Sequence, residues 1–341
     1  MIKQVFQKAK QIVKENSKGF ILFFVLLIVL TFEFPYYIDT PGGTIDISSR
    51  IEVEDGYTAK GSFHLAYVSE LKATIPTLLI SYFKKDWDII KKSEVVMENE
   101  DTKDVYFRDR LQLEEANQNA IIVAFRKAGK EVQIKNTQLY ITYIDPLADT
   151  DLKVGDEIIK VNETPISSKS ELNPIIQAHE IGDTIFFTVI RNQHEMEVSA
   201  KVIAYEDRKM IGLMMTEKQE IETDPKIEFH FKSSESGPSG GLMMTLAIYN
   251  QLVKEDITKG KKIVGTGTID VDGTVGEIAG VKYKLKGAEK SKADLFFVPN
   301  GKNYEEAMQL KNDLDYEIEI VGVSTFDEAL EYLNTYIESQ E

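Results

Sequence analysis

The sequence predicts an α/β protein that also carries a small strand-rich module and an N-terminal apolar helix. Three observations lead to this fold class. Strands and helices alternate after residue 237, short strands dominate residues 130–205, and residues 19–32 are uncharged and apolar. Alternating strands and helices are typical of layered folds, because each helix covers one face of a sheet. A chain of 341 residues has room for two or three domains with cores of their own.

The N-terminal segment has the composition of a membrane anchor. Residues 1–18 hold five lysines and one glutamate, and the next fourteen residues read GFILFFVLLIVLTF. A membrane span needs about 17–25 residues, but Phe34, Tyr36 and Tyr37 can extend this one as interfacial aromatics. No small-residue cleavage site follows. We therefore expect an uncleaved transmembrane signal anchor over residues 19–37, in preference to a cleaved signal peptide or a buried core helix.

Composition excludes several classes of function. The net charge of −16 opposes binding to nucleic-acid phosphates. The absence of cysteine excludes disulfides, thiolate metal sites and a cysteine nucleophile. The sequence also contains neither a phosphate-binding G-x-x-x-x-G-K-[ST] motif nor an H-E-x-x-H metal motif. We therefore expect no cofactor, and no ATP hydrolysis by this chain.

Residues 38–129 give mixed signals without a reactive constellation. We expect them to form scaffold, with an exposed charged loop at 94–109 and a helix that stops at Ala128-Gly129. The expected elements are a strand at 61–68 and helices at 75–85, 86–92 and 113–127.

Residues 130–205 resemble a PDZ domain. The segment from Leu152 to Asn162 matches the pattern L-x-x-G-D-x-I-x-x-V-N, and Pro165-Ile166 and Ser170-Glu171-Leu172 follow it as in that family. PDZ domains bind extended peptides at a sheet edge beside a helix. The resemblance implies a groove lined by Leu139, Ile141, Ile175 and Ile176, although these residues are equally compatible with a plain core. The expected elements are strands at 132–134, 138–144, 157–161, 184–191 and 196–202 and a helix at 168–178.

Gly237-Pro238-Ser239-Gly240-Gly241 leads directly into a helix whose apolar residues begin at Leu242. Ser239 therefore lies at a helix N-terminus, where free N–H groups favour a developing oxyanion. A serine nucleophile needs a base, and Lys282 opens a second helix, expected over residues 281–293. Spacing alone does not distinguish Lys282 from Lys286, and a turn or a solvated lysine face would give the same pattern. Strands follow at 295–298 and 317–323, and helices at 304–313 and 325–337.

Three blocks in this region resemble the proteolytic domain of Lon-type Ser-Lys peptidases. They are Gly237 to Gly241, Gly265 to Ile269, and Gly273-x-Val275-Gly276-x-Ile278-Ala279-Gly280-Val281-Lys282-x-Lys284. The resemblance assigns Ser239 as nucleophile, Lys282 as base and Thr266 as a neighbour of the lysine amine. It also implies that N–H groups around Gly237 and Gly240 bind the oxyanion. The sequence departs from the family at Ala279 and Tyr283.

The whole chain resembles the membrane-anchored, PDZ-containing Lon-like proteases of Gram-positive bacteria. This implies a cytoplasmic basic tail (1–18), the anchor (19–37), the first part of the Lon-like domain (38–120), an inserted PDZ domain (121–206) and the catalytic part (207–341). It implies an ATP-independent endopeptidase outside the cell, acting on exposed peptides, with a homo-oligomer as in the family's rings. Two alternatives remain: a non-catalytic PDZ adaptor, and a Ser-His-Asp hydrolase using His230.

Overall fold

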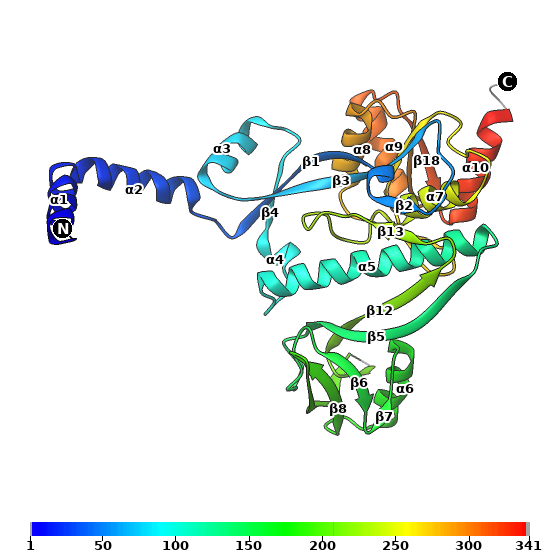
Figure 1. The fold of residues 1–341 in the computed structure, drawn as a ribbon, viewed down its shortest axis with the longest axis horizontal. Coiled ribbons are helices and arrows are strands. Elements are labelled where there is room, and N and C mark those ends of the chain that lie inside the picture. Colours follow the sequence, from blue (N-terminus) through cyan, green and yellow to red (C-terminus); the bar gives the residue numbers. More distant parts are fainter. Residues whose placement is uncertain (1, 207, 339–341) are drawn as a thin grey trace. The chain divides into compact units, whose positions relative to one another are not determined.

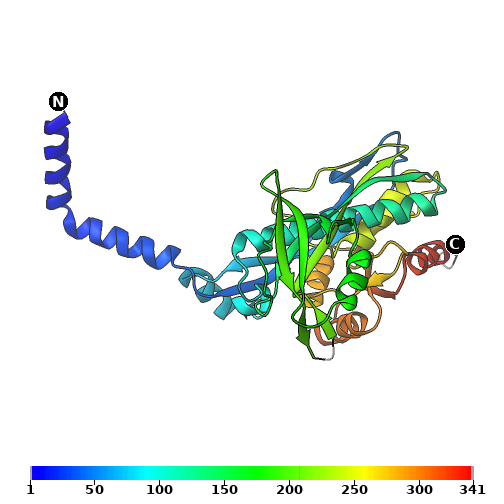
Figure 2. The same cartoon turned by 90° about the horizontal axis from the view of Figure 1, so that it is seen from below.

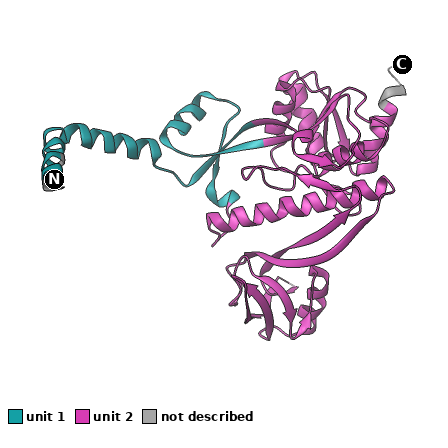
Figure 3. Cartoon of the chain, in the orientation of Figure 1, with its two compact units in different colours: residues 1–41, 68–95 teal, residues 42–67, 96–341 magenta. Residues whose placement is uncertain are grey.

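The computed structural model describes residues 2–206 and 208–338, so the outermost residues of the expected tail and catalytic part, and residue 207, lie outside it (Figure 1). The chain divides into two compact units. The first contains residues 1–41 and 68–95, and the second contains residues 42–67 and 96–341 (Figure 3). Strands β1 (Tyr36–Asp46) and β3 (Ser62–Lys72) each run through both units.

The first unit holds the expected anchor, but the helix there is shorter than the sequence suggests. Helix α2 (Ser17–Thr31) has fifteen residues, and Tyr36 and Tyr37 already belong to β1, so a single helix over 19–37 was wrong. Among the described residues, no helix combines the length and the apolar content that crossing a membrane requires. The unit also contains α1 (Ile2–Glu15), α3 (Ile75–Phe83), α4 (Lys92–Val95) and β4 (Asp88–Lys91), the last a strand where a helix was expected.

A parallel sheet between two layers of helices forms the centre of the second unit (Figure 1). Its strands follow the order β18 (Glu319–Val323), β17 (Leu295–Pro299), β14 (Lys262–Gly265) and β3. Successive residues face opposite layers: Ile263 packs with α5 (Thr102–Lys127), α7 (Gly241–Leu252) and α10 (Phe326–Glu338), whereas Val264 packs with α8 (Val281–Lys290) and α9 (Lys302–Leu314). This three-layer arrangement confirms the α/β fold class.

Strand β3 precedes the strand-rich module in the sequence, while β14 follows it, yet the two pair in parallel from Lys262↔Ser62 to Gly265↔Leu65. The module is therefore inserted into the α/β fold. Shorter elements complete this fold: η1 (Ile47–Ser49), β2 (Ile51–Val53), β13 (Ile227–Phe229), β15 (Thr268–Ile269) and β16 (Val275–Gly276).

The strand-rich module has its own core and a five-strand path in the order β12-β5-β6-β8-β9. Seen from below, α6 lies alongside these strands (Figure 2). The long strands β5 and β12 pair from Leu213↔Ile144 to Thr223↔Val132 and lead back to α5. The module comprises β5 (Val132–Ile144), β6 (Glu157–Val161), β7 (Thr164–Pro165), α6 (Lys169–Ala178), β8 (Thr184–Arg191), β9 (His194–Lys201), β10 (Ile203–Tyr205), β11 (Arg208–Met210) and β12 (Leu213–Thr223).

Helix α5 begins eleven residues before the expected helix, inside the segment taken for an exposed loop. Asp101 caps its first turn by accepting from the N–H groups of Lys103 (2.7 Å) and Asp104 (2.9 Å). Arg108 is 8% exposed and pairs with Glu100. This buried ion pair interrupts the apolar stripe by which a sequence pattern would reveal the helix.

Candidate active site

Ser239 lies in the loop that enters α7, and its backbone is tied to the end of β14. The Ser239 carbonyl accepts from the Gly267 N–H (2.8 Å) and from the Thr266 hydroxyl (3.0 Å). Thr266 directly follows β14 and is fully buried. The loop is therefore fixed at the carboxyl end of a parallel strand, which is where open α/β sheets place their ligand sites.

Lys284 reaches the same point from the opposite helical layer. It lies in the first turn of α8, is 4% exposed, and its Nζ donates to Thr266 Oγ1 (3.1 Å). Two successive hydrogen bonds through Thr266 therefore connect the amine to the Ser239 carbonyl. Burial lowers the pKa of Lys284 to about 8, because the charged form loses its hydration. A buried amine of this kind can act as a base near neutral pH.

Lys282, the base that the family resemblance implies, stays a prediction, and the structure adds Lys284 of the same helix as a second candidate. The buried face of α8 carries Val281, Lys284, Leu285 and Ala288, at the spacing of one helical stripe. Lys282 lies off this stripe, half-buried, with its Nζ 5.5 Å from the centre of the Tyr283 ring.

Two contacts that the sequence did not indicate hold the loop before Ser239. Glu235 forms a two-pronged ion pair with Arg50 (Nε–Oε2 2.8 Å, Nη2–Oε1 2.7 Å), which also lowers the pKa of Glu235. The Gly237 N–H donates to the Asp109 carbonyl on α5 (3.3 Å), with Gly237 at φ +87°. Only glycine adopts that conformation readily, so this position sets the direction in which the chain approaches Ser239.

The two expected oxyanion donors, the N–H groups of Gly237 and Gly240, differ in whether they already have a hydrogen-bond partner. The Gly237 N–H is occupied by Asp109, whereas within the described residues neither the Gly240 N–H nor the Ser239 hydroxyl has a hydrogen-bond partner. Gly240 immediately precedes α7, so its N–H belongs to the positive end of the helix. The loop at Ser239 therefore brings together the Ser239 hydroxyl, the Gly240 N–H and, through Thr266, the Lys284 amine with its lowered pKa. Among the described residues, no cluster of His, Asp and Glu suits a metal ion.

The four residues that were expected to line a peptide groove of the strand-rich module belong to its core or pack against it. Leu139, Ile141 and Ile176 are buried in the module's core, and Ile175 packs against it. Strand β5 is paired at Leu139 with both Glu217 of β12 and Ile158 of β6. A peptide cannot add to an edge that is already occupied on both sides, so these residues are core rather than groove.

Comparison with known proteins agrees with this division of the chain. Residues 119–202 match the PDZ domain family, and residues 194–335 match the family described as the Lon protease (S16) C-terminal proteolytic domain. The chain contains a PDZ domain and a Lon-type proteolytic domain. The second family consists of serine proteases.

Several known proteins resemble parts of the chain. The Lon protease of Campylobacter jejuni is 26% identical over 219 residues, covering 59% of this chain and 25% of that protein. Lon protease 2 of Bacillus subtilis is 35% identical over 95 residues, covering 28% of this chain and 16% of that protein. The chain therefore spans a quarter or less of the length of these relatives. The solved PDZ domain of the SdrC-like protein from Listeria monocytogenes aligns with 25% of this chain and 92% of its own, at 19% identity and a TM-score of 0.22.

Proposed function

We propose that the chain is a serine endopeptidase in which Ser239 is the nucleophile and Lys284 is the base. One observation carries this proposal: a buried amine with a pKa lowered to about 8 is joined through Thr266 to the residue that bears the hydroxyl. A Lon-type proteolytic domain implies the same class of activity.

In the proposed reaction the Ser239 hydroxyl attacks the scissile carbonyl while its proton passes to Lys284 Nζ. A bond forms between Oγ and the carbonyl carbon, and the carbonyl oxygen becomes an oxyanion facing the Gly240 N–H. Contacts of this type are each worth about 3–4 kcal/mol of barrier. The protonated lysine then donates to the leaving amine, and water hydrolyses the acyl-enzyme by the same route. Thr266 Oγ1 holds Nζ in place because it accepts from the amine while it donates to the Ser239 carbonyl.

The proposed substrates are exposed, flexible peptide segments outside the cell. The chain has no phosphate-binding motif for an ATP-driven unfolding step, so cleavage would be ATP-independent, with the PDZ domain capturing or gating substrate. Support for a membrane location comes from α2, in which every residue is exposed, including Phe23 at 60% and Leu26 at 52%. Such a surface is unfavourable in water, and the basic residues 1–18 before it suit a cytoplasmic side.

Labelling with a serine-directed phosphonate tests the catalytic part of this proposal. We expect the wild-type protein to be labelled at Ser239 and to cleave unstructured peptides, and Ser239→Ala to lose both properties. Lys284→Met should lower cleavage at least a thousandfold, whereas the neighbouring Lys282→Met serves as a matched control and should retain it. Retained activity in Lys284→Met with loss in Lys282→Met would reverse the assignment. Folded protein that is never labelled yet binds peptides would support a non-catalytic adaptor.

Membrane attachment is tested separately by alkaline extraction of cell membranes and by protease treatment of intact cells. We expect the full chain to stay with the membrane and the proteolytic domain to be accessible from outside. Release of the full chain by alkaline buffer would contradict the anchor and leave the catalytic proposal intact.

A further inference from the structure

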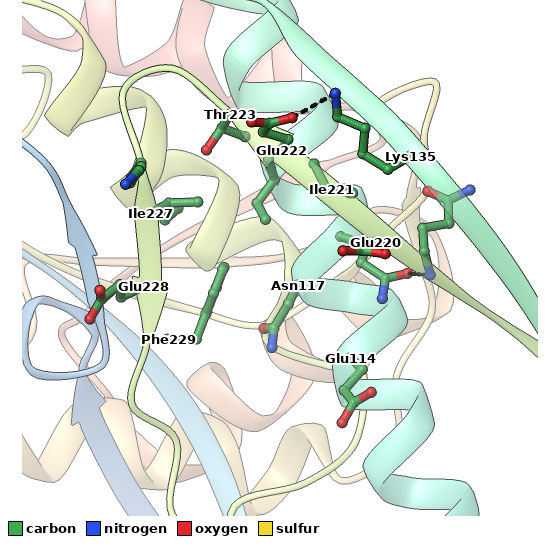
Figure 4. Close-up of a pocket in the computed structure, with 14 residues that line it drawn as sticks. Glu114, Asn117, Lys135, Glu220, Ile221, Glu222, Thr223, Ile227, Glu228 and Phe229 are labelled. Atoms are coloured by element: carbon green, nitrogen blue, oxygen red, sulfur yellow. Dashed lines mark hydrogen bonds and ion pairs between the residues drawn. The ribbon is translucent and has the colours of Figure 1, made fainter. Parts of the chain in front are cut away.

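A cavity of about 760 Å³ opens between α5, β12 and β13 in the second unit (Figure 4). Its floor is α5, and one strand forms each side. Consecutive residues of both strands line it, which means that the strands present their edges, and not only one face, to the cavity. The lining residues are Glu114, Asn117, Gln118, Ile121, Lys135, residues 219–223 and residues 226–229.

Strand β13 presents an unpaired edge to this cavity. On its other side, the Lys226 carbonyl accepts from the Glu54 N–H (2.8 Å) and the His230 N–H donates to the Arg50 carbonyl (2.7 Å). In an antiparallel pair, residues alternate between bonding the partner and facing away from it. The backbone groups of Ile227 and Phe229 therefore face away from β2, which in the described part of the chain is the only strand that pairs with β13.

The cavity also contains acceptors that the protein itself leaves unused. Asn117 Oδ1 and Gln219 Oε1 are buried, and neither has a hydrogen-bond partner within the described residues. Asn117 projects from α5 into the cavity (Figure 4). Buried acceptors without partners are costly, so a ligand that brings donors would be stabilised by these two side chains.

The charge of the lining selects among such ligands. Four glutamates and two lysines line the cavity. Glu222 is paired with Lys135 at 2.6 Å and Glu114 with Lys218 at 2.9 Å, which leaves Glu220 and Glu228 against Lys226. A cationic side chain from a ligand would therefore enter a net negative environment that also offers free carbonyl oxygens. The four glutamates are Glu114, Glu220, Glu222 and Glu228.

Helix α5 contacts both the loop that bears Ser239 and the cavity, so positions along it give the separation between them. Asp109 of α5 accepts from Gly237 in the nucleophile loop, and the cavity begins at Glu114 and extends to Ile121 on the same helix. At 1.5 Å per helical residue these positions lie about 8 to 18 Å further along α5. An extended peptide covers that interval with about two to six residues.

We propose that this cavity binds an extended segment of the substrate peptide, which adds as a strand to the free edge of β13. A lysine or arginine side chain of the peptide donates to Asn117 Oδ1 and Gln219 Oε1. The peptide ligand class rests on the proposed peptidase function, and it makes basic residues about two to six positions from the scissile bond a specificity determinant.

Binding to full-length Ser239→Ala tests this site without turnover. The probes are fluorescein-labelled Ala/Ser dodecapeptides with one lysine at each position in turn, and the matched peptides with norleucine, measured by fluorescence polarisation. We expect one position, or two of the same strand face, at which lysine binds at least fivefold more tightly than norleucine. Asn117→Leu should remove this preference. Asn312→Leu, an exposed asparagine on α9, is the matched control and should keep it.

Backbone N-methylation of the tightest peptide tests strand addition. We expect methylation at every second residue to weaken binding at least tenfold, with little effect at the residues between, because only alternate N–H groups face β13. An effect without alternation, or a lysine preference that persists in folded Asn117→Leu, would overturn the site. Melting curves establish that this variant is folded, and Asn117→Ser replaces it if it is not.

The two proposals fail in distinguishable ways. Phosphonate labelling of Ser239 together with peptide binding that ignores Asn117 would leave a serine peptidase and reject the cavity. A lysine preference that depends on Asn117 in a protein whose Ser239 is never labelled would retain the cavity as a peptide site and reject the peptidase.

Discussion

Lys284 is an ionisable residue that is almost completely buried. Because it is the proposed base, its pKa should set the pH dependence of activity. The residue is 4% exposed, and burial lowers the pKa of its amine to about 8. In the proposed mechanism, only the neutral amine can accept the Ser239 proton. We expect kcat/KM to rise about tenfold per pH unit below pH 8 and to level off above it. The measurement is the pH profile of peptide cleavage, restricted to the range in which circular dichroism shows folded protein. A midpoint near 10.5 would mean that the base is a solvated lysine.

The same burial should lower stability at neutral pH. Because the pKa of Lys284 is lower in the folded state than in the unfolded state, the folded protein binds fewer protons between pH 8 and 10.5. The free-energy cost is therefore complete below about pH 8 and disappears as the pH rises towards 10.5. A shift of this size corresponds to about 3 kcal/mol.

We therefore expect Lys284→Met to abolish cleavage while raising the free energy of unfolding at pH 7 by as much as about 3 kcal/mol. The gain should shrink when urea unfolding is repeated near pH 10. Lys282→Met, which removes a half-buried lysine from the same helix, should not gain stability. A loss of stability in Lys284→Met at pH 7 would contradict the account of the buried amine.

At the scale of elements, the junction between the Ser239 loop and α7 depends on the close approach of Gly241 to Ile269. A Cβ atom on Gly241 would lie 2.7 Å from Ile269 Cγ2 and 2.8 Å from the Ile269 nitrogen, so the first turn of α7 contacts β15 directly. A Cβ on Gly240 would meet its nearest atom, Leu65 Cδ2, at 3.4 Å, an ordinary contact.

Gly241→Ala should therefore displace α7 from β15 and move Ser239, at a cost of about 1–3 kcal/mol in stability and at least a hundredfold in kcat/KM. Gly240→Ala is the matched control for stability, since its φ of −93° suits alanine, and its free energy of unfolding should remain close to that of the wild type. Urea unfolding and peptide cleavage are measured for both. Equal effects of the two substitutions on the free energy of unfolding would show that the contact with Ile269 is unimportant.

The elements that the sequence predicted correctly are those with strong apolar periodicity. The strand at 295–298 and the helix behind Gly241 were placed to within a few residues, because their core faces are uninterrupted. The first half of α5 was missed, since Arg108 is buried as an ion pair with Glu100 and breaks the apolar stripe. The burial of Lys284 was not predicted for a similar reason: a lysine on the buried face of a helix is rare, and its burial becomes evident only when α8 covers Thr266.

At the scale of the whole proteolytic unit, α5 connects the inserted PDZ domain with both sides of the active-site region. Its Asn119 side chain donates to the Ile269 carbonyl (2.9 Å), and Arg126 donates to the Val271 carbonyl (3.2 Å). On its other side α5 packs against β12, with the Gln118 side chain accepting from the Gln219 N–H (3.0 Å). The ends of β5 and β12 next to α5, residues 132–138 and 218–223, therefore belong structurally to the proteolytic domain. Only residues 139–217 of the module are separable from it.

This boundary can be tested by replacing residues 139–217 with an Asn-Gly turn. Gln138 and Lys218 are directly opposed in the antiparallel ladder, so a two-residue turn can join them as a hairpin. The ion pair between Lys218 and Glu114 (2.9 Å) and the contact between Gln219 and α5 are kept. The separate core of the PDZ domain is removed as a whole, without opening the cluster around α7.

We expect the shortened protein to fold cooperatively and to cleave short unstructured peptides within about tenfold of the wild-type kcat/KM, because Ser239, Thr266 and Lys284 and the helices that position them are unchanged. Cleavage of longer substrates that use the PDZ domain for capture should fall further, through KM more than kcat. The comparison uses the same hairpin carrying Ser239→Ala as its inactive control. A shortened protein that folds but cleaves no short peptide would mean that the PDZ domain maintains the catalytic geometry itself, through α5, rather than delivering substrate to it.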